Sequence, residues 1–248
     1  MVNLDTKNFW DTELNDYEKQ IISVFVYDNL LIEKINKIES KQSKTIADVG
    51  CGTGNAFQYF KKFQKNYAVD YSENMLNIAK KKQTGNEKFI LENIENYKLP
   101  VKVDITFAIS SIIPDSLNHF FQMFDNIVKN TKKKGSIYFV VSSFEARTFF
   151  LQIEADYMFQ KNIPVQTILE HIKKTERDIN YSSFGYFVTS TKLIQKHWLR
   201  EELLYRLERY NFNDIKIEKL KLNWEHQLRL PEYNQFPQSW LWLISIKI

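Results

Sequence analysis

The chain has few cysteines, glycines and prolines, and no long apolar run. Cys51 is the one cysteine among 248 residues, so no disulfide can form within the chain. No apolar stretch approaches the roughly 20 residues that a membrane-spanning helix needs. The first residues are polar and acidic and do not resemble a signal peptide. We therefore expect a cytoplasmic protein that makes no contact with a membrane.

A strong charge of either sign is also missing. The 34 basic and 30 acidic residues leave a net charge of +4, and the basic residues are scattered rather than gathered into one tract. Proteins that bind nucleic acid usually concentrate basic charge on one face, so a nucleic-acid partner is not expected. The length fits one α/β domain with additions, and a hydrophobic fraction of 44% is enough for a sizeable core.

Three of the six glycines fall in one short run, IADVGCGTGNA at residues 46–56. A short apolar strand leads into Gly50, Gly52 and Gly54, where a tight turn lets backbone approach a ligand closely. A second apolar stretch, YAVD, ends at Asp70, twenty positions after Gly50. An acid at this offset lies next to a ribose in open α/β sheets. The two segments together predict a site for a nucleoside cofactor.

Strand and helix patterns alternate around this run. Strands are expected at residues 45–50, 66–70, 88–92, 103–110 and 136–143, with helices at 55–63, from a cap at Ser72, and at 115–129. The alternation predicts a doubly wound, mostly parallel sheet with right-handed crossovers. We further expect a helix over 9–38, helices over 145–174 interrupted at Pro164, an extended stretch over 180–192, a helix over 198–210, and strands over 214–224 and 240–248.

Phe57 argues against a dinucleotide cofactor. The dinucleotide motif is G-x-G-x-x-G, and Phe57 stands near the place of its third glycine. A bulky ring there is expected to crowd a pyrophosphate, so we expect a nucleoside-like ligand without bridging phosphates. An NAD-dependent enzyme is the alternative, and Phe57 argues against it.

The run from Asp48 through Gly54 resembles the first motif of the class I S-adenosylmethionine-dependent methyltransferases, an acid and a hydrophobic residue followed by G-x-G-x-G. Asp48, Gly50, Gly52 and Gly54 match it position by position. The resemblance covers residues 45 to about 142, and more loosely the last helix and two strands. It implies a seven-stranded, mostly parallel Rossmann-like sheet with an antiparallel C-terminal strand.

The resemblance also implies the cofactor, S-adenosylmethionine, which leaves as S-adenosylhomocysteine, and no metal. Asp70 would bind the ribose hydroxyls, and Asn93 stands where the family often has an aspartate that meets the adenine amino group. Ordinary core packing is the alternative for Met75, and a polar strand end is the alternative for Ser110. The predicted cofactor-binding residues are Tyr17, Asp48, Gly50, Cys51, Gly52, Gly54, Asp70, Tyr71, Met75, Asn93, Ile94 and Ser110.

Residues 145–192 form an insertion at the carboxyl end of the fifth strand, where open sheets bind ligands. Glu145 and Arg147 begin it, and a guanidinium there could hold a substrate carboxylate, with a surface ion pair as the alternative. Tyr181 and Tyr186 would line an acceptor pocket or form a small core. Residues 1–44 are expected to form a helical lid on the methyltransferase domain, residues 45–248.

We therefore expect a methyltransferase that acts on nitrogen or oxygen of a small molecule. The alternatives are an RNA or protein methyltransferase, and a non-catalytic cofactor-binding partner subunit. No general base stands out in the sequence, and the oligomeric state is not predicted.

Overall fold

The computed structural model describes residues 24–25, 29–177, 185–188 and 194–248. Seven strands form one sheet in the order β3-β2-β1-β4-β5-β9-β8. They are β1 (Thr45–Val49), β2 (Lys65–Asp70), β3 (Glu87–Leu91), β4 (Val103–Ile109), β5 (Thr131–Ser142), β8 (Asp214–Lys221) and β9 (Trp240–Lys247). The first five pair in parallel, and β9 runs antiparallel to both β5 and β8. The predicted fold, with its antiparallel C-terminal strand, is confirmed.

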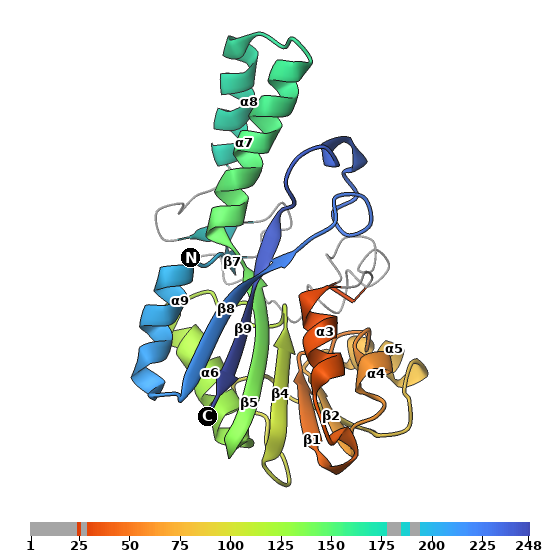
Figure 1. Ribbon diagram of the computed structural model, residues 1–248. Helices are drawn as coiled ribbons and strands as arrows, with labels where there is room; N and C mark the ends of the chain where they lie inside the picture. The colour runs from red at the N-terminus through yellow and green to blue at the C-terminus, as the bar shows by residue number, and fades with distance from the viewer. Residues whose placement is uncertain (1–23, 26–28, 178–184, 189–193) are drawn as a thin grey trace.

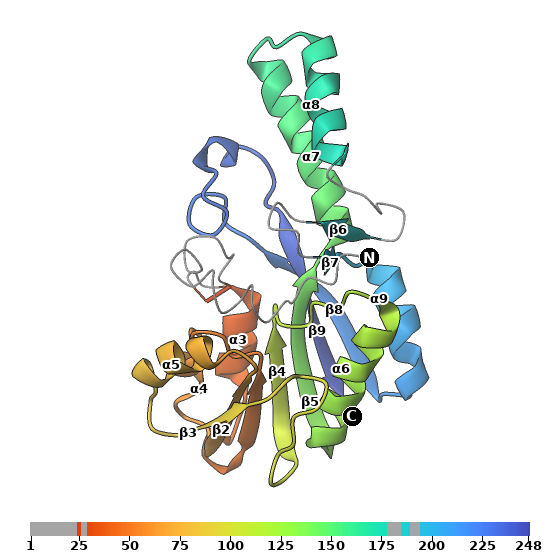
Figure 2. The same ribbon diagram turned by 180° about the vertical axis from the view of Figure 1, so that it is seen from behind.

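Helices cover both faces of this sheet. The longer helices are α3 (Leu30–Lys37), α5 (Glu73–Lys81), α6 (Leu117–Asn130), α7 (Phe144–Gln160), α8 (Val165–Arg177) and α9 (Arg200–Leu207). Short helical turns are α4 (Phe57–Phe60), η1 (Lys41–Ser43), η3 (Glu208–Tyr210) and η4 (Pro231–Tyr233). Figure 1 shows α3 in front of the strands, and Figure 2 shows α6 and α9 in front of the opposite face.

The central strands are buried on both sides because successive side chains enter different cores. Ile46 and Phe107 pack with α3, while their neighbours Ala47 and Ala108 pack in the larger core on the side of α6 and α9. Phe107 is fully buried between Phe60 and Tyr138. This two-sided burial accounts for the continuous apolar runs in the strands.

Several expected boundaries are wrong. The helix predicted over 9–38 does not run unbroken, because Val24 and Phe25 form a turn and the extended Asn29 caps a new helix by accepting hydrogen bonds from the N–H groups of Leu31 and Ile32. The apolar period continues across this break because Val24 and Leu31 pack in the same core.

Two further segments start or end elsewhere than predicted. The helix expected over 55–63 shrinks to the single turn of α4, because the glycine turn continues to Ala56. Strand β5 begins at Thr131 rather than at residue 136, and a register shift opposite Val103 and Ile105 accommodates the extra residues. The helix expected over 198–210 begins at Arg200, because Trp198 pairs with Ser143 instead.

The insertion leaves the sheet at the carboxyl end of β5. Helices α7 and α8 form the predicted pair interrupted at Pro164, and they project from the edge toward which the β4 arrow points (Figure 1). The lower part of α7 packs on the loop between β8 and β9 through Ile153, Trp224 and Tyr233. Beyond α8, β6 (Tyr186–Val188) and β7 (Ile194–Lys196) form a small antiparallel sheet. Within the described ranges, no helix is long and apolar enough to cross a membrane.

Candidate cofactor and acceptor site

The glycine turn between β1 and α4 is held against the end of β2. Gly50 and Cys51 both donate backbone hydrogen bonds to the Val69 carbonyl, at 2.8 and 3.0 Å. Gly50 has φ of 71°, and a Cβ there would lie 2.2 Å from Cβ of Ser111. Ser111 donates from its hydroxyl to the Val49 carbonyl at 2.6 Å, which keeps the loop after β4 in place. Position 50 therefore requires glycine for both its conformation and its close contact.

Asp70 ends β2 with both carboxylate oxygens engaged by backbone. Its Oδ2 accepts from the Gly52 N–H at 2.8 Å, and its Oδ1 accepts from the Ser72 N–H at 3.0 Å. The carboxylate is 6% exposed. Each oxygen of an ionised carboxylate has capacity for a further hydrogen bond, so this carboxylate can also accept from a pair of neighbouring hydroxyls.

Asp48 is the second acid under the turn, and it is 3% exposed. Its Oδ2 has no hydrogen-bond partner among the described residues, and neither does the buried hydroxyl of Thr53. Burial, with the nearby charge of Asp70, raises the pKa of Asp48 to about 7. A buried carboxylate oxygen without a partner is costly, and a cationic ligand group beside it would remove that cost.

The side chains of Cys51 and Phe57 pack beneath the glycine turn. Both are buried in a small core with Ala68 and Leu76. Burial, together with the two nearby carboxylates, raises the pKa of the Cys51 thiol well above its usual range, so it is a poor nucleophile. The Phe57 ring is fully buried under Gly54, so our expectation that it would crowd a phosphate directly is wrong. Helix α4 has only four residues, so it offers little of the helix dipole that favours a pyrophosphate.

The residues predicted for the adenine side follow β2 and β3. Tyr71 is half-buried, Met75 is buried, and Ile94 is buried beneath the loop. Asn93 is exposed, and its side-chain oxygen accepts from the Glu95 N–H at 3.3 Å. The structure thus brings these residues to the same sheet edge as Asp70, and their contact with a cofactor stays a prediction.

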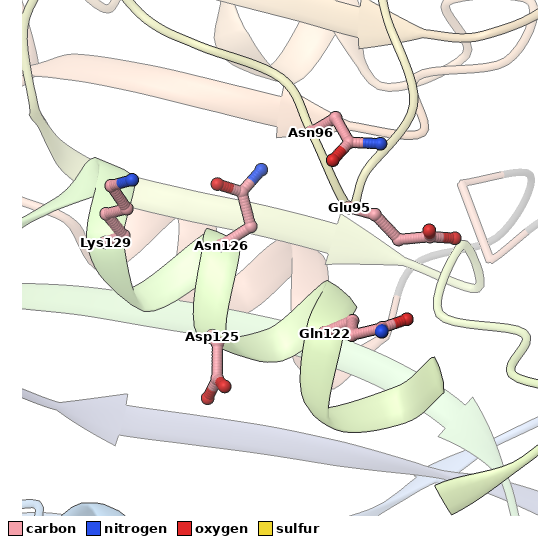
Figure 3. A pocket seen from close by; sticks show the side chains of 6 residues that line it. All are labelled: Glu95, Asn96, Gln122, Asp125, Asn126 and Lys129. Atoms are coloured by element: carbon pink, nitrogen blue, oxygen red, sulfur yellow. The ribbon is translucent and has the colours of Figure 1, made fainter. Parts of the chain in front are cut away.

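A polar pocket of about 390 Å³ lies beside this loop rather than in the glycine turn. Figure 3 shows Glu95 and Asn96 of the loop opposite four side chains of α6: Gln122, Asp125, Asn126 and Lys129. Asn126 donates to the carbonyls of Ile94 and Tyr97, at 2.8 and 3.1 Å. The lining of the pocket therefore fastens the loop to α6, which fixes the position of Ile94.

His119 makes a second connection at this edge. Its ring bridges Glu95 of the loop after β3 and Asp115 of the loop after β4. In the sequence, only the spacing of four residues from Asp115 on one helix face distinguishes His119. The bridge joins two loops that flank the predicted site.

Ser110, the residue after β4, has φ of 55°, a left-handed conformation unusual for a residue other than glycine. Its N–H donates to the Val140 carbonyl at 3.0 Å, which holds the chain beside β5. Backbone strain of this kind gathers at functional sites. Its position at the carboxyl ends of β4 and β5 agrees with the predicted location next to the reacting end of the cofactor.

On the acceptor side, Glu145 is already engaged. Its Oε1 accepts from the Arg200 N–H at 2.8 Å, and its Oε2 accepts from the Ser143 hydroxyl and the Trp242 indole, both at 3.2 Å. These bonds fix α7 to α9 and β9 and favour a structural role for Glu145 over substrate binding.

The other acceptor-side predictions divide between described and undescribed residues. Arg147 is half-buried in the first turn of α7, and Tyr186 lies on β6 with the Lys196 ammonium 5.3 Å from its ring centre. Tyr181 and Tyr17 lie outside the described residues, as do residues 1–23 and 26–28 of the lid expected over 1–44. In the part of the chain that is described, no group of three or more His, Cys, Asp or Glu side chains could hold a metal ion.

Comparisons with known proteins agree with this geometry. Residues 46–135 match the family model of a methyltransferase domain. The probable S-adenosylmethionine-dependent methyltransferase CRG1 of Saccharomyces cerevisiae is 22% identical over 243 residues, which cover 94% of this chain and 79% of the yeast protein. Residues 46–135 therefore resemble a methyltransferase domain, and the similarity to the yeast protein extends over most of the chain.

Two solved structures share the fold of this chain. An S-adenosylmethionine-dependent methyltransferase from Methanosarcina mazei superposes with a TM-score of 0.59 at 14% identity, covering 88% of this chain and 96% of that one. A 1,6-didemethyltoxoflavin-N1-methyltransferase from Burkholderia thailandensis, with S-adenosylhomocysteine bound, superposes with a TM-score of 0.59 at 10% identity, covering 97% of this chain and 84% of that one.

The buried acids would suit S-adenosylmethionine, the cofactor that the sequence predicts. The unpartnered Oδ2 of Asp48 fits an ammonium group such as the one on the methionine end. The buried carboxylate of Asp70 fits the two ribose hydroxyls. The assignment of individual residues to parts of the cofactor stays a prediction.

Replacing Gly50 by Ala should remove S-adenosylhomocysteine binding. The new Cβ would collide with Ser111, and the left-handed backbone would be strained, so the turn must move away from Asp70. Calorimetric titration measures the loss. Gly85→Ala is the matched control: its φ is also positive, at 105°, but nothing lies within 4 Å of its Cβ position, so binding should persist. Unchanged affinity in Gly50→Ala would contradict the role of the turn.

Asp48 should make both stability and cofactor affinity depend on pH. Its folded-state pKa of about 7 lies above the ordinary value of 3.8, so the folded state holds the extra proton between these values. Its contribution to stability is therefore lost progressively as pH rises from about 4 to about 7. Asp48→Asn should raise the melting temperature of the cofactor-free protein at pH 8 and change it little at pH 4.

Cofactor affinity should increase with pH, whereas the stability of the cofactor-free protein should decrease. The wild-type affinity for S-adenosylhomocysteine should fall as pH drops below 7 and Asp48 loses its charge, whereas Asp48→Asn should bind weakly with little pH dependence. Asp104→Asn is the control, because Asp104 pairs with Lys132 and Thr45 at the far end of the sheet. The same pH profile in wild type and Asp48→Asn would refute the assignment.

Proposed function

We propose that this protein transfers the methyl group of S-adenosylmethionine to a nitrogen or oxygen of a small-molecule acceptor. The observation that supports it most is the pair of buried acids beneath the glycine turn, because one oxygen of Asp48 has no hydrogen-bond partner among the described residues. Two unlike carboxylates at the carboxyl ends of β1 and β2 suit one ligand that carries both an ammonium and a pair of hydroxyls.

The predicted cofactor-binding residues surround that ligand from three strand ends. Asp70 would hold the ribose, Asp48 the amino group, and the loop with Asn93 and Ile94 the adenine. Ser110 would present backbone to the methionine end. Cys51, Tyr71 and Met75 would supply packing around these contacts. Tyr17 is proposed to close over them as part of a lid formed by the residues before α3, because α3 itself is packed in the core.

The cofactor, when bound, supplies a methyl group on a positively charged sulfur for in-line displacement by the acceptor. The residues of this chain would orient the acceptor and exclude water. The acceptor atom must lie about 3 Å from the methyl group, in line with the carbon–sulfur bond. The left-handed Ser110 and the start of α7 form the part of the edge from which the acceptor would approach. A carboxylate or phenol acceptor needs little help from a base, whereas an alcohol or ammonium does.

The insertion is proposed as the wall of the acceptor pocket. Helix α7 begins directly at the carboxyl end of β5, and the β6–β7 sheet lies at its foot in both views (Figures 1 and 2). A protruding wall of this kind encloses a small molecule. The Burkholderia structure, which shares the fold, contains a bound small molecule, 1,6-didemethyltoxoflavin. This supports an acceptor of similar size.

Turnover with an acceptor panel tests the proposal. Purified protein is incubated with S-adenosylmethionine and small amines, phenols or carboxylic acids, and formation of S-adenosylhomocysteine and methylated product is measured. At least one class should give product. Product only with RNA or protein substrates would contradict a small-molecule function, and no turnover with any class would favour a non-catalytic partner subunit.

Asp70→Ala serves as the inactive variant in this assay. It removes the acceptors of the Gly52 and Ser72 N–H groups, so we expect loss of turnover together with a stability loss of about 1–3 kcal/mol. Retained turnover in this variant would show that Asp70 does not hold the cofactor.

A further inference from the structure

Arg147 carries a half-buried positive charge that the fold does not neutralise. Among the described residues, its guanidinium makes no hydrogen bond or ion pair. The positions three and four residues away along α7 hold no acid: they are Ser143, Phe144, Phe150 and Leu151. Glu145, the nearest acid in sequence, is occupied by Arg200, Ser143 and Trp242. Arg147 therefore has unused capacity for an anion.

A second polar group is brought beside the start of α7 by backbone pairing. The Trp198 N–H donates to the Ser142 carbonyl at 2.9 Å, and the Phe144 N–H donates to the Trp198 carbonyl at 3.0 Å. These bonds place His197 next to the junction of β5 and α7. Its own N–H donates to the Gly185 carbonyl at 2.7 Å, and its ring lies 4.3 Å from that of Phe187.

The His197 imidazole is uncharged at neutral pH. Its pKa is lowered to about 4, first by burial and then by the charges of Arg147 and Lys196. The buried Nδ1 of the ring has no hydrogen-bond partner among the described residues. One nitrogen of a neutral imidazole is an acceptor, so Nδ1 can accept a hydrogen bond when the other ring nitrogen carries the proton.

Lys196, the other cation nearby, is already neutralised. Its ammonium donates to the Glu202 carboxylate at 2.7 Å and to the His197 carbonyl at 2.9 Å, and it lies over the rings of Tyr186 and Trp198. Among the described residues at this junction, the cation without a partner is therefore Arg147, whose charge also acts on His197.

We propose that the methyl acceptor is a carboxylate-bearing small molecule that also carries a hydroxyl or amino hydrogen, bound by Arg147 and His197. The guanidinium fork matches a carboxylate, and Nδ1 of His197 accepts the hydrogen of the second group. Both groups lie at the carboxyl end of β5, the edge where Ser110 is bonded to Val140. This inference rests on the proposed function, because it assigns the acceptor of the same site.

Calorimetry on the protein saturated with S-adenosylhomocysteine tests the carboxylate. The probes are salicylate and salicylamide, benzoate and benzamide, and malonate and malonamide. In wild type, a carboxylate should bind at least about tenfold more tightly than its uncharged amide. Arg147→Gln should abolish this preference, and Arg147→Lys should keep part of it because the charge remains without the fork. The matched control is Arg200→Gln, because Arg200 is exposed at the start of α9 and pairs with Glu201, so the preference should persist.

The contact proposed for His197 is tested with a separate variant. His197→Phe should remove the advantage of salicylate over benzoate, while the preference of benzoate over benzamide remains. A merely structural role of Arg147 would lower the melting temperature of Arg147→Gln; we expect no loss, since no partner is broken.

The outcomes separate this inference from the proposed function. Absence of carboxylate preference in wild type, or its survival in Arg147→Gln, overturns the assignment of the acceptor while leaving the cofactor site intact. Failure of wild type to bind S-adenosylhomocysteine in the same titration overturns the proposed function itself.

Discussion

The connection between the glycine turn and the end of β2 is the constraint on which the site depends. The Val69 carbonyl accepts two N–H groups of the turn, and the next residue, Asp70, accepts a third from Gly52. The carboxyl ends of the adjacent parallel strands β1 and β2 are thereby aligned, with their polar groups side by side. The loops after β3 and β4 are then held to the same edge through His119 and Ser111. A ligand that contacts several strand ends needs this alignment before it arrives.

The site contains buried charged groups without partners among the described residues, and bound ligands of opposite charge would stabilise them. Asp48 is buried near Asp70 with one oxygen unpartnered, and Arg147 is half-buried without a described counter-charge. A fold selected for stability alone would replace such groups with apolar ones. Their signs are informative, because an acid suits the cationic cofactor and a base suits an anionic acceptor. The two charges lie at different strand ends, as separate cofactor and acceptor positions require.

Local sequence patterns predicted the parts of the fold that depend on nearby residues. The glycine spacing and the apolar run ending at Asp70 were enough for the turn, the parallel strands and the cofactor, because each follows from short-range geometry. The break at Asn29 was missed because apolar residues on both sides of it enter the same core and mimic one continuous helix.

Long-range contacts decided what the sequence could not show. Glu145 looked available for substrate until the structure paired it with Arg200 and Trp242, far along the chain. His197 drew no attention as an isolated histidine, and its proximity to Arg147 arises only from the pairing of Trp198 with the end of β5. Ser111 likewise gave no signal, since its contact with Gly50 depends on the neighbouring strand.

The central claim is that the turn and its two acids form a ready site for a sulfonium nucleoside without bridging phosphates. Calorimetric titration of the wild-type protein with S-adenosylmethionine, S-adenosylhomocysteine and NAD tests it most directly. We predict micromolar binding of both sulfur nucleosides and no heat with NAD. Binding of NAD, or no binding of either sulfur nucleoside, would contradict the account.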